Sequence, residues 1–363
     1  MIDALEAVGR AAGLDAVGVA AATPFERTRE DLERRKAAGL AAGMQFTYRN
    51  PARSTEPERA LPGARALVVG ARSYAHERDG HDGAVPGGAV PGGAGAARPT
   101  GRVARYARDD HYAALREGLE AMAAHLRAAG WRTRVLADDN ALVDREAAVR
   151  AGLGWYGKSA NVLLPGRGSW FVLGSVVTDA PLVPAAEPVE DGCGTCTRCL
   201  DGCPTGAIVA PGVVDARRCL AWLVQAPGSF PEEWRVALGD RIYGCDDCQE
   251  VCPPNRRSDR EVEAAGAAGA TVDLLDLLAA DDDTLLARHG RWYIAGRDPR
   301  HLRRNALLAL GNAADPDDTE VLRVLEAVAA GDDELLGEHA RWARRRLAHR
   351  RAEANGARAG ASR

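Results

Sequence analysis

The sequence predicts an α+β protein built from three parts. Residues 1–184 alternate segments of helical spacing with short apolar runs, which is typical of an α/β domain whose central sheet is covered by helices. All eight cysteines of the chain lie between residues 193 and 252. Beyond residue 271 the chain is rich in leucine and alanine at helical spacing, which predicts paired helices in a short HEAT-like array. A chain of 363 residues is long enough for two or three domains with buried cores.

The α/β part begins with alternating elements. We predict a helix over 2–13, a strand over 16–21, an arginine-rich helix over 28–42 and a buried strand over 66–71. Residues 77–101 consist mostly of glycine, alanine and proline. Because such a segment buries too little side chain to offset the entropy lost on ordering, we predict a flexible surface loop there.

Further helices and strands complete the predicted sheet. Helices over 106–126 and 141–151 flank a strand over 132–136, and two apolar strands follow over 160–164 and 170–177. A proline-rich segment after residue 180 is predicted to link this domain to the cysteine-bearing part. The predicted boundaries are 1–184 for the α/β domain, 185–258 for the domain that holds the cysteines, 259–352 for the helical domain and 353–363 for a disordered tail.

The cysteines follow the spacing of bacterial ferredoxins. They read Cys193-x2-Cys196-x2-Cys199-x3-Cys203-Pro204, then Cys219, then Cys245-x2-Cys248-x3-Cys252-Pro253. In this spacing three thiolates bind one 4Fe–4S cluster, and the cysteine before the proline reaches a second cluster. The second run lacks its first cysteine, which Cys219 can supply. We therefore predict a ferredoxin-like domain with two clusters, the first held by Cys193, Cys196, Cys199 and Cys252 and the second by Cys203, Cys219, Cys245 and Cys248.

Two other uses of the cysteines are less consistent with the sequence. Zinc sites of four cysteines use separated pairs, whereas here three cysteines at short intervals crowd one loop. Disulfides need an oxidising compartment. Residues 1–21 show neither the basic region and apolar core of a signal peptide nor a twin-arginine pattern, so we expect a cytoplasmic protein. No apolar run approaches the roughly 20 residues of a membrane helix, so we expect no membrane contact.

Several polar positions are candidate functional residues with a structural alternative. Asp138 is expected in the turn after a strand, where catalytic carboxylates commonly lie, although it could instead cap the next helix. His111 lies in a polar cluster over 105–112, where it could be a ligand, an acid–base group or part of a solvated helix end. The glycines of the stretch 152–158 permit close approach of a large ligand, but they also form turns.

Arginine supplies almost all of the positive charge. A net charge of −4 gives no global reason to bind nucleic acid, so any basic surface must be local. Arg303 and Arg304, beside Asn305, form one cluster that could neutralise RNA phosphates, and the arginines between residues 341 and 346 form another. The alternative for both clusters is an ordinary solvated helix face.

Long motifs in the chain resemble those of epoxyqueuosine reductases. They are Asp138 with the following Ala151-Gly-Leu-Gly-Trp-Tyr-Gly-Lys158, Gly168-Ser-Trp-Phe-Val-Leu-Gly174, the eight cysteines, Tyr243-Gly-Cys-Asp-Asp-Cys-Gln249 and Arg304-Asn305-Ala-Leu-Leu-Ala-Leu-Gly-Asn312. The resemblance implies a cytoplasmic oxidoreductase that uses cobalamin and two 4Fe–4S clusters. Its implied reaction reduces the epoxide of epoxyqueuosine to queuosine, at the anticodon wobble position of a tRNA with a GUN anticodon.

The resemblance also implies roles for individual residues. Asp138 matches the proton donor of the family, and an ordinary aspartate would need a raised pKa for that role. The implied enzyme is a monomer that receives electrons from an external low-potential donor, and its second cluster lies nearer the cobalt. The implied contacts of base-off cobalamin are Arg53, Asp138, Val143, Val162, Leu173, Ala221, Cys245 and Asp246.

Three other functions stay open from the sequence. A reductase related to the reductive dehalogenases would use the same cofactors on another substrate. A non-catalytic electron-transfer protein would need only the clusters, and an RNA-binding scaffold would use them structurally. The long segment before residue 193 exceeds what a ferredoxin requires, which favours an enzyme.

Overall fold

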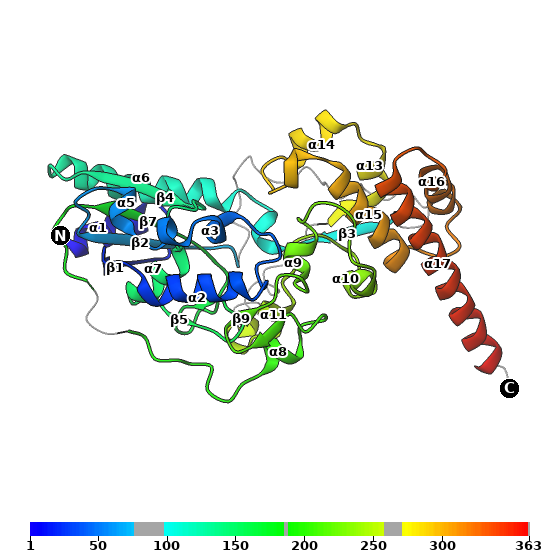
Figure 1. The fold of residues 1–363 in the computed structure, drawn as a ribbon, viewed down its shortest axis with the longest axis horizontal. Helices are drawn as coiled ribbons and strands as arrows, with labels where there is room; N and C mark the ends of the chain where they lie inside the picture. Colours follow the sequence, from blue (N-terminus) through cyan, green and yellow to red (C-terminus); the bar gives the residue numbers. More distant parts are fainter. Residues whose placement is uncertain (76–97, 185–187, 258–270, 362–363) are drawn as a thin grey trace. The chain divides into compact units, whose positions relative to one another are not determined.

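A computed structural model describes residues 1–75, 98–184, 188–257 and 271–361, and these residues form two compact units (Figure 1). This division differs from the three predicted domains, because the cysteine-bearing segment is shared between the units. Apolar side chains in the middle of this segment, such as Leu220, Leu223 and Phe230, are buried in the core of the second unit. The first unit contains residues 1–75, 110–184, 188–219 and 246–257, and the second contains 98–109, 220–245 and 271–361.

The first unit is built on a four-stranded antiparallel sheet in the order β1-β2-β7-β4. All four strands were predicted from their apolar runs. In β2 every residue from Ala66 to Ala71 is buried, since both faces of the sheet are covered. The predicted strand over 160–164 is only the short β6, which pairs with β5 outside this sheet. The strands are β1 (Ala16–Ala21), β2 (Ala66–Ser73), β4 (Thr133–Ala137), β5 (Trp155–Tyr156), β6 (Val162–Leu163) and β7 (Phe171–Thr178).

Helices cover the two faces of this sheet (Figure 1). Helices α1 (Ile2–Ala11) and α6 (His111–Ala128) lie on one face, where Leu119 of α6 packs against Gly70 of β2. Helix α7 (Asp144–Arg150) lies on the other face. Gly18 permits this packing, because a Cβ there would lie 2.4 Å from the carbonyl oxygen of Ala151. The predicted α/β architecture is thus confirmed for this unit.

Short elements complete the first unit. The hairpin of β8 and β9 precedes Cys219, and α8 and α11 lie within the two cysteine runs. Their bounds, with the remaining helices, are α2 (Glu26–Ala37), α3 (Phe46–Arg49), α4 (Pro51–Ser54), α5 (Pro57–Ala60), α8 (Arg198–Asp201), β8 (Ile208–Ala210), β9 (Val213–Val214) and α11 (Asp247–Glu250).

The second unit combines a small sheet with helices. Strand β3 (Thr100–Val103) pairs in parallel with β10 (Arg241–Tyr243) and antiparallel with β11 (Thr271–Asp273). The predicted loop over 77–101 lies outside the described residues up to 97, and its last two residues belong to β3. Gly101 suits this strand, because a Cβ there would lie 2.4 Å from Ile242.

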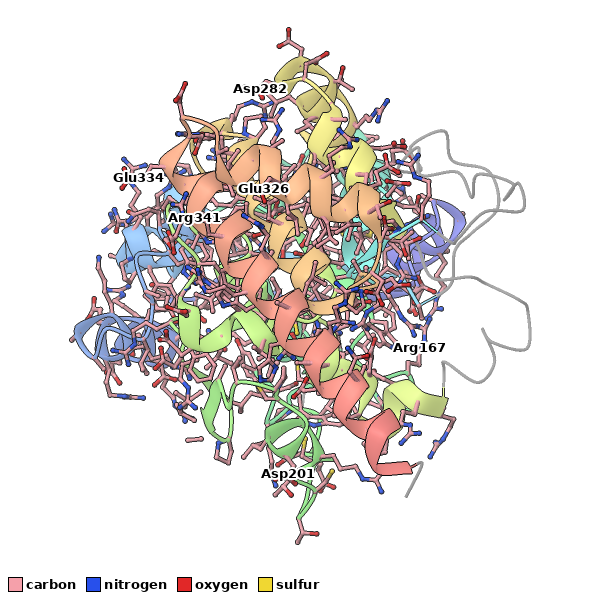
Figure 2. The ribbon with its side chains drawn as sticks, turned by 90° about the vertical axis from the view of Figure 1, so that its right-hand side faces the viewer. Arg167, Asp201, Asp282, Glu326, Glu334 and Arg341 are labelled. Carbon is pink, nitrogen blue, oxygen red and sulfur yellow. The ribbon has the colours of Figure 1, made fainter. Side chains whose placement is uncertain are left out.

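The helices of the second unit follow the predicted leucine-rich segments. Helices α15, α16 and α17 pack together, and Arg341 of α17 donates a hydrogen bond to the carbonyl of Ala329 at the end of α16 (Figure 2). The helices are η1 (Arg105–Ala107), α9 (Leu220–Leu223), η2 (Glu232–Trp234), α10 (Arg235–Leu238), α13 (Leu274–Ala279), α14 (Asp282–His289), η3 (Ala295–Arg297), α15 (Arg300–Ala313), α16 (Thr319–Ala329) and α17 (Glu334–Ala361).

The last helix extends further than predicted. Residues 353–363 were expected to form a disordered tail, but α17 continues to Ala361. The segment contains no proline, and its four alanines favour the helix even though Asn355, Gly356 and Gly360 are poor helix formers. Within the described part of the chain, no helix is both long and apolar enough to cross a bilayer.

Candidate active site

Asp138 lies directly after β4, in the turn that leads to α7. Its φ of 52° is a left-handed conformation that is uncommon for a residue with a side chain. The N-cap of α7 is Val143, and Asp139 accepts a hydrogen bond from the N–H of Ala141 at 2.8 Å. The predicted position after a strand is therefore confirmed, and the alternative role of Asp138 as a helix cap is excluded.

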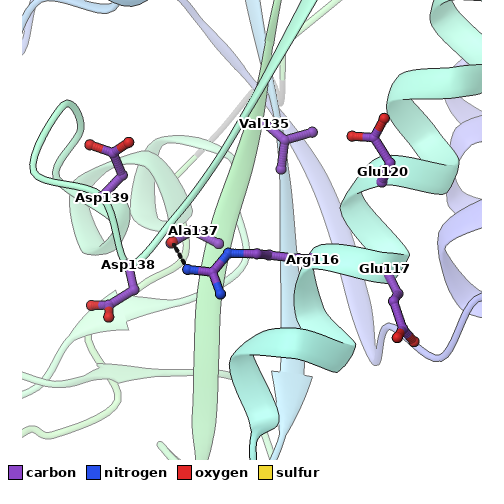
Figure 3. A pocket seen from close by; sticks show the side chains of 7 residues that line it. All are labelled: Arg116, Glu117, Glu120, Val135, Ala137, Asp138 and Asp139. Carbon is purple, nitrogen blue, oxygen red and sulfur yellow. Dashed lines mark hydrogen bonds between the residues drawn. The ribbon is translucent and has the colours of Figure 1, made fainter. Parts of the chain in front are cut away.

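Asp138 borders a hollow of about 520 Å³ on the first unit (Figure 3). Arg116 reaches toward the same turn and donates a hydrogen bond to the carbonyl of Ala137 at 2.8 Å. Partial burial raises the pKa of Asp138, the charge of Arg116 opposes this change, and Asp139 adds to it. Since the residue also keeps an exposed surface, it combines access for a substrate with a carboxyl that holds its proton more readily than a free aspartate.

Two ionisable side chains beside Asp138 were not identified from the sequence. Burial raises the pKa of Tyr112 in α6, and the carboxylates of Asp138 and Asp144 raise it further. Burial likewise raises the pKa of Asp144 well above its ordinary value, while a hydrogen bond from the backbone of Asp138 acts in the opposite direction. Tyr112 belongs to the polar cluster over 105–112, so a signal was present, whereas Asp144 carried none.

His111 is not part of a solvated helix end. It is only 9% exposed, and its ring centroid lies 5.6 Å from that of Tyr74. Helix α6 is capped instead by Asp110, whose carboxylate accepts a hydrogen bond from the N–H of Ala113. The other two roles considered for His111, as a ligand or an acid–base group, stay predictions.

The first unit gathers most of the residues that the resemblance assigns to cobalamin. Val162 and Leu173 belong to one buried apolar cluster, and Val143 packs against it. Arg53 is in α4, which is held beside the Asp138 turn by a 3.0 Å hydrogen bond from the N–H of Val143 to the carbonyl of Ser54. These three apolar side chains belong to the core of the unit, whereas the hollow beside Asp138 is lined mostly by charged residues. Asp246 is buried in the same unit, whereas Ala221 and Cys245 belong to the second unit.

The thiols of the predicted first cluster lie close together. Burial raises the pKa of Cys252 to about 11, with further contributions from the charges of Cys193, Cys199 and Cys196. Burial also raises the pKa of Cys199, and Cys193 and Cys196 add to it. The structure therefore brings the cysteine of the second run to the three of the first, as the cross-over rule requires. In the predicted second cluster, Cys203, Cys219 and Cys248 belong to the first unit and Cys245 to the second.

Among the described residues, no three cysteine, histidine, aspartate or glutamate side chains are grouped closely enough to hold one ion. All eight cysteines are half-buried. A cubane cluster bonds each thiolate through a different iron atom, so its ligands stand further apart than those of zinc.

Buried hydrogen bonds attach the second cysteine run to the start of β7. The amide of Gln249 donates to the hydroxyls of Tyr74 and Ser169, both at 3.1 Å. Asn255 accepts a hydrogen bond from the N–H of Ser169 at 2.6 Å and donates to its hydroxyl at 3.0 Å. Gly168 is required here, because a Cβ would lie 1.9 Å from Oδ1 of Asn255. The cysteine run therefore has a fixed position on the sheet.

Arg304 has a structural role that the sequence did not reveal. It is fully buried and donates hydrogen bonds to main-chain carbonyls that include those of Leu223 and Ala226, at 3.0 and 2.8 Å. Its predicted contact with tRNA is therefore corrected, since its donors face the interior of the second unit. Arg303 is 14% exposed and pairs with Asp282 at 2.6 Å. Asp282 is the first residue of α14 (Figure 2). A tRNA contact of Arg303 stays a prediction.

Comparisons with known proteins identify a domain and relatives of this chain. Residues 192–255 match the family of 4Fe-4S double cluster binding domains. The chain is 33% identical to the epoxyqueuosine reductase of Bacillus cereus over 327 residues, which cover 87% of this chain and 83% of that protein. It is 41% identical to the Escherichia coli epoxyqueuosine reductase over 236 residues, or 62% of this chain and 61% of that one.

Solved structures give the same result. A crystal structure of selenomethionine-labelled epoxyqueuosine reductase matches with a TM-score of 0.81 and 30% identity, covering 95% of this chain and 90% of that chain. An epoxyqueuosine reductase with an epoxyqueuosine-modified tRNA stem loop matches with a TM-score of 0.78, 29% identity and the same coverage.

Together, an α/β sheet with an acid at its edge and a double-cluster domain define an iron–sulfur oxidoreductase. The extent and identity of the match to the Bacillus cereus protein make the assignment specific. The chain belongs to the epoxyqueuosine reductase family.

Proposed function

We propose that the chain reduces the epoxide of epoxyqueuosine to the alkene of queuosine in tRNA, with Asp138 as the proton donor. The observation that supports this role most directly is the position of Asp138, an accessible carboxyl with a raised pKa in the turn after β4. A relative has been crystallised with an epoxyqueuosine-modified tRNA stem loop. The structure of the Bacillus subtilis relative has a catalytic aspartate loop swung out of its active site, at 29% identity and a TM-score of 0.80.

The reaction sets the number of electrons and protons required. Removal of the epoxide oxygen as water consumes two electrons and two protons. The two clusters can deliver the electrons one at a time, and an external low-potential donor replaces them. When bound, cobalamin supplies a low-potential cobalt centre for opening the strained ring. Asp138 gives a proton to the oxygen as the C–O bond breaks, so that no unstabilised alkoxide has to leave.

Several finer assignments belong to this proposal. Base-off cobalamin would contact Arg53, Val143, Val162 and Leu173 beside Asp138, with Ala221, Cys245 and Asp246 completing the set. The substrate would be a tRNA with a GUN anticodon, and the enzyme would act as a cytoplasmic monomer. Helices α15, α16 and α17 would form a short HEAT-like array, which their mutual packing supports.

The proposal is tested by anaerobic turnover. The chain is reconstituted with iron, sulfide and cobalamin, and is supplied with a strong reductant and tRNA that contains epoxyqueuosine. Mass spectrometry of the nucleosides should show queuosine, which is lighter than its precursor by one oxygen atom. Absence of conversion with intact clusters and bound cobalamin would contradict the proposed substrate.

A variant tests the role of Asp138 in the same assay. Asp138→Asn keeps the size of the side chain but cannot donate a carboxylic proton, so we expect turnover to fall by about 10²- to 10⁴-fold. Cobalamin content and the spectra of both clusters should stay unchanged. Asp3→Asn is the control, since this aspartate is exposed in α1 and does not line the hollow. Normal turnover of Asp138→Asn would contradict the assignment of the acid.

A further inference from the structure

The β5–β6 hairpin is held rigidly next to the cysteines of the first unit. Its turn is closed by a hydrogen bond from the N–H of Gly157 to the carbonyl of Asn161 at 2.8 Å. The carbonyl of Lys158, in this turn, accepts a hydrogen bond from the N–H of Gly212 at 3.0 Å, which ties the turn to the loop between β8 and β9. The backbone around Lys158 is therefore fixed from two directions.

The side chain of Lys158 binds the loop that carries the first two cysteines. Its ammonium nitrogen donates hydrogen bonds to the carbonyl oxygens of Gly194, at 2.7 Å, and Cys196, at 2.9 Å. The backbone also approaches this loop, because a Cβ at Gly157 would lie 3.7 Å from the sulfur of Cys193. Both hydrogen bonds are charge-assisted, so they are stronger than those between neutral groups.

The same hairpin turn approaches the second cysteine run. The side-chain amide nitrogen of Asn161 lies 4.0 Å from the sulfur of Cys248. Three residues of one turn therefore touch segments of both predicted clusters. Gly154 is required for this packing, because a Cβ there would lie 2.0 Å from the carbonyl oxygen of Leu163.

A fixed ammonium beside a cluster has an electrostatic consequence. Reduction adds a negative charge to the cluster and its thiolates, and a nearby positive charge stabilises that reduced form. The reduction potential of an iron–sulfur cluster depends on net charge, on hydrogen bonds and on solvent exposure. A lysine that both orders the ligand loop and supplies positive charge therefore acts on assembly and on potential together.

We propose that Lys158 is a positioning residue for the first cluster. It holds the loop from Cys193 to Cys196 in the conformation that binds iron, and it raises the reduction potential of that cluster. The proposal rests on the proposed ligand set of Cys193, Cys196, Cys199 and Cys252. It does not depend on Asp138, on cobalamin or on the identity of the substrate.

The test measures potentials and iron retention without turnover. Wild-type chain and the variants Lys158→Met, Lys158→Arg and Lys36→Met are reconstituted with iron and sulfide alone and titrated with reductant under electron paramagnetic resonance. Lys36 is the matched control, because it is the only other lysine and is exposed. Cys196→Ser, which removes a ligand of the first cluster, identifies the signal of that cluster.

In Lys158→Met we expect the potential of the first cluster to shift to a more negative value, while the second cluster is unchanged. Iron should also be lost to a chelator about tenfold faster, because two charge-assisted hydrogen bonds are removed. Lys158→Arg should keep most of the wild-type potential, and Lys36→Met should match the wild type.

Two results would overturn the proposal. One is a Lys158→Met variant whose first cluster has the reduction potential of the wild type and whose iron is lost to the chelator at the wild-type rate. The other is a Lys158→Met variant that assembles only one cluster and is not rescued by Lys158→Arg, which would show that positive charge at this position is not what holds the loop. Failure of the tRNA assay would leave both readouts unaffected, since neither uses the substrate.

Discussion

Asp144, the first residue of α7, has a carboxylate oxygen, Oδ1, that is buried and meets no hydrogen-bond partner among the described residues. Burial raises the pKa of this carboxyl, and the charges of Asp138 and Asp139 raise it further. Arg145 acts in the opposite direction. A free aspartate loses its proton near pH 4, so between that pH and its raised pKa the folded chain binds a proton that the unfolded chain has released.

The sign of the resulting pH dependence follows from this difference. The stabilisation by protonated Asp144 is fully present below the ordinary carboxyl pKa and is lost as pH rises toward the raised pKa. Asp144→Asn removes this titration while keeping the shape of the side chain. We expect the melting temperature of the variant, relative to the wild type, to increase from about pH 5 to about pH 8.

Thermal unfolding of both proteins at several pH values gives this difference, with Asp3→Asn as the control. Asp3 is an exposed aspartate in the first turn of α1. A constant difference between Asp144→Asn and the wild type across the pH range would show that Asp144 is ionised in the folded chain.

Residues that follow a sequence rule were predictable, and those that depend on packing were not. The cysteines and Asp138 were found because ligand spacing and the position after a strand are local features of the chain. Tyr112 and Asp144 lie about thirty residues apart in the chain, and each becomes unusual only because burial changes its pKa. Such burial is set by how α6 and α7 pack on the sheet, which no local pattern contains.

Among the elements, the turn between β6 and β7 shows how one short segment positions the cysteine run. Gly166 and Gly168 both have positive φ, at 70° and 74°. A Cβ at Gly166 would have open space, whereas one at Gly168 would collide with Asn255. Alanine at position 166 therefore tests backbone strain alone. Alanine at position 168 also tests the loss of the hydrogen bonds between Asn255 and Ser169.

We expect Gly166→Ala to lower the free energy of unfolding by about 1–2 kcal/mol, because only the left-handed backbone is strained. Gly168→Ala should lower it by a further 1–3 kcal/mol or so, since it displaces a buried hydrogen-bonded amide. Urea unfolding of the cluster-loaded chain, followed by circular dichroism and by the visible absorbance of the clusters, measures both. Equal losses in the two variants would contradict the role given to Asn255.

Elements were predicted best where their periodicity was strong. The four strands of the main sheet and α15 follow apolar runs or helical spacing, and they lie where expected. In the stretch 152–158, Gly152 forms a turn with a positive φ of 71°, which is one of the two predicted roles, whereas Gly154 and Gly157 pack closely against Leu163. A glycine reveals that something approaches the backbone, but the sequence does not say what approaches.

The division of the whole molecule into units differs from the predicted domains for a physical reason. Residues 220–245 contain Leu220, Leu223 and Phe230, whose side chains enter the core of the second unit. The flanking cysteine runs instead bury polar side chains such as Gln249 and Asn255 in the first unit. Cysteine spacing locates the ligands of the clusters and therefore predicts one domain around them. The compact units are instead defined by which side chains are buried together.

The role of Arg304 also follows from its burial in the second unit and not from a sequence pattern. That role can be tested. Desolvation, together with the nearby charge of Arg235, lowers the pKa of Arg304 to about 10, so this arginine stays charged at neutral pH. Its guanidinium also bonds to the side-chain oxygen of Asn305, whose amide donates to the carbonyls of Val224 and Ile242 at 2.9 and 3.0 Å. These bonds connect α15 to the segment after α9 and to β10 within the second unit.

Arg304→Ala should therefore lower the free energy of unfolding of the second unit by at least about 3 kcal/mol, because it leaves several buried carbonyls without donors and opens a cavity. Arg304→Lys should recover part of this loss, since one ammonium cannot replace a planar fork of donors. Arg303→Ala, which removes a pair with the exposed Asp282 and one hydrogen bond to the carbonyl of Ala280, should cost less than Arg304→Ala. Urea unfolding followed by tryptophan fluorescence compares the three variants.

If Arg304→Ala unfolds like Arg303→Ala while binding of a tRNA stem loop weakens, Arg304 contacts RNA after all, and the buried role assigned to it is wrong.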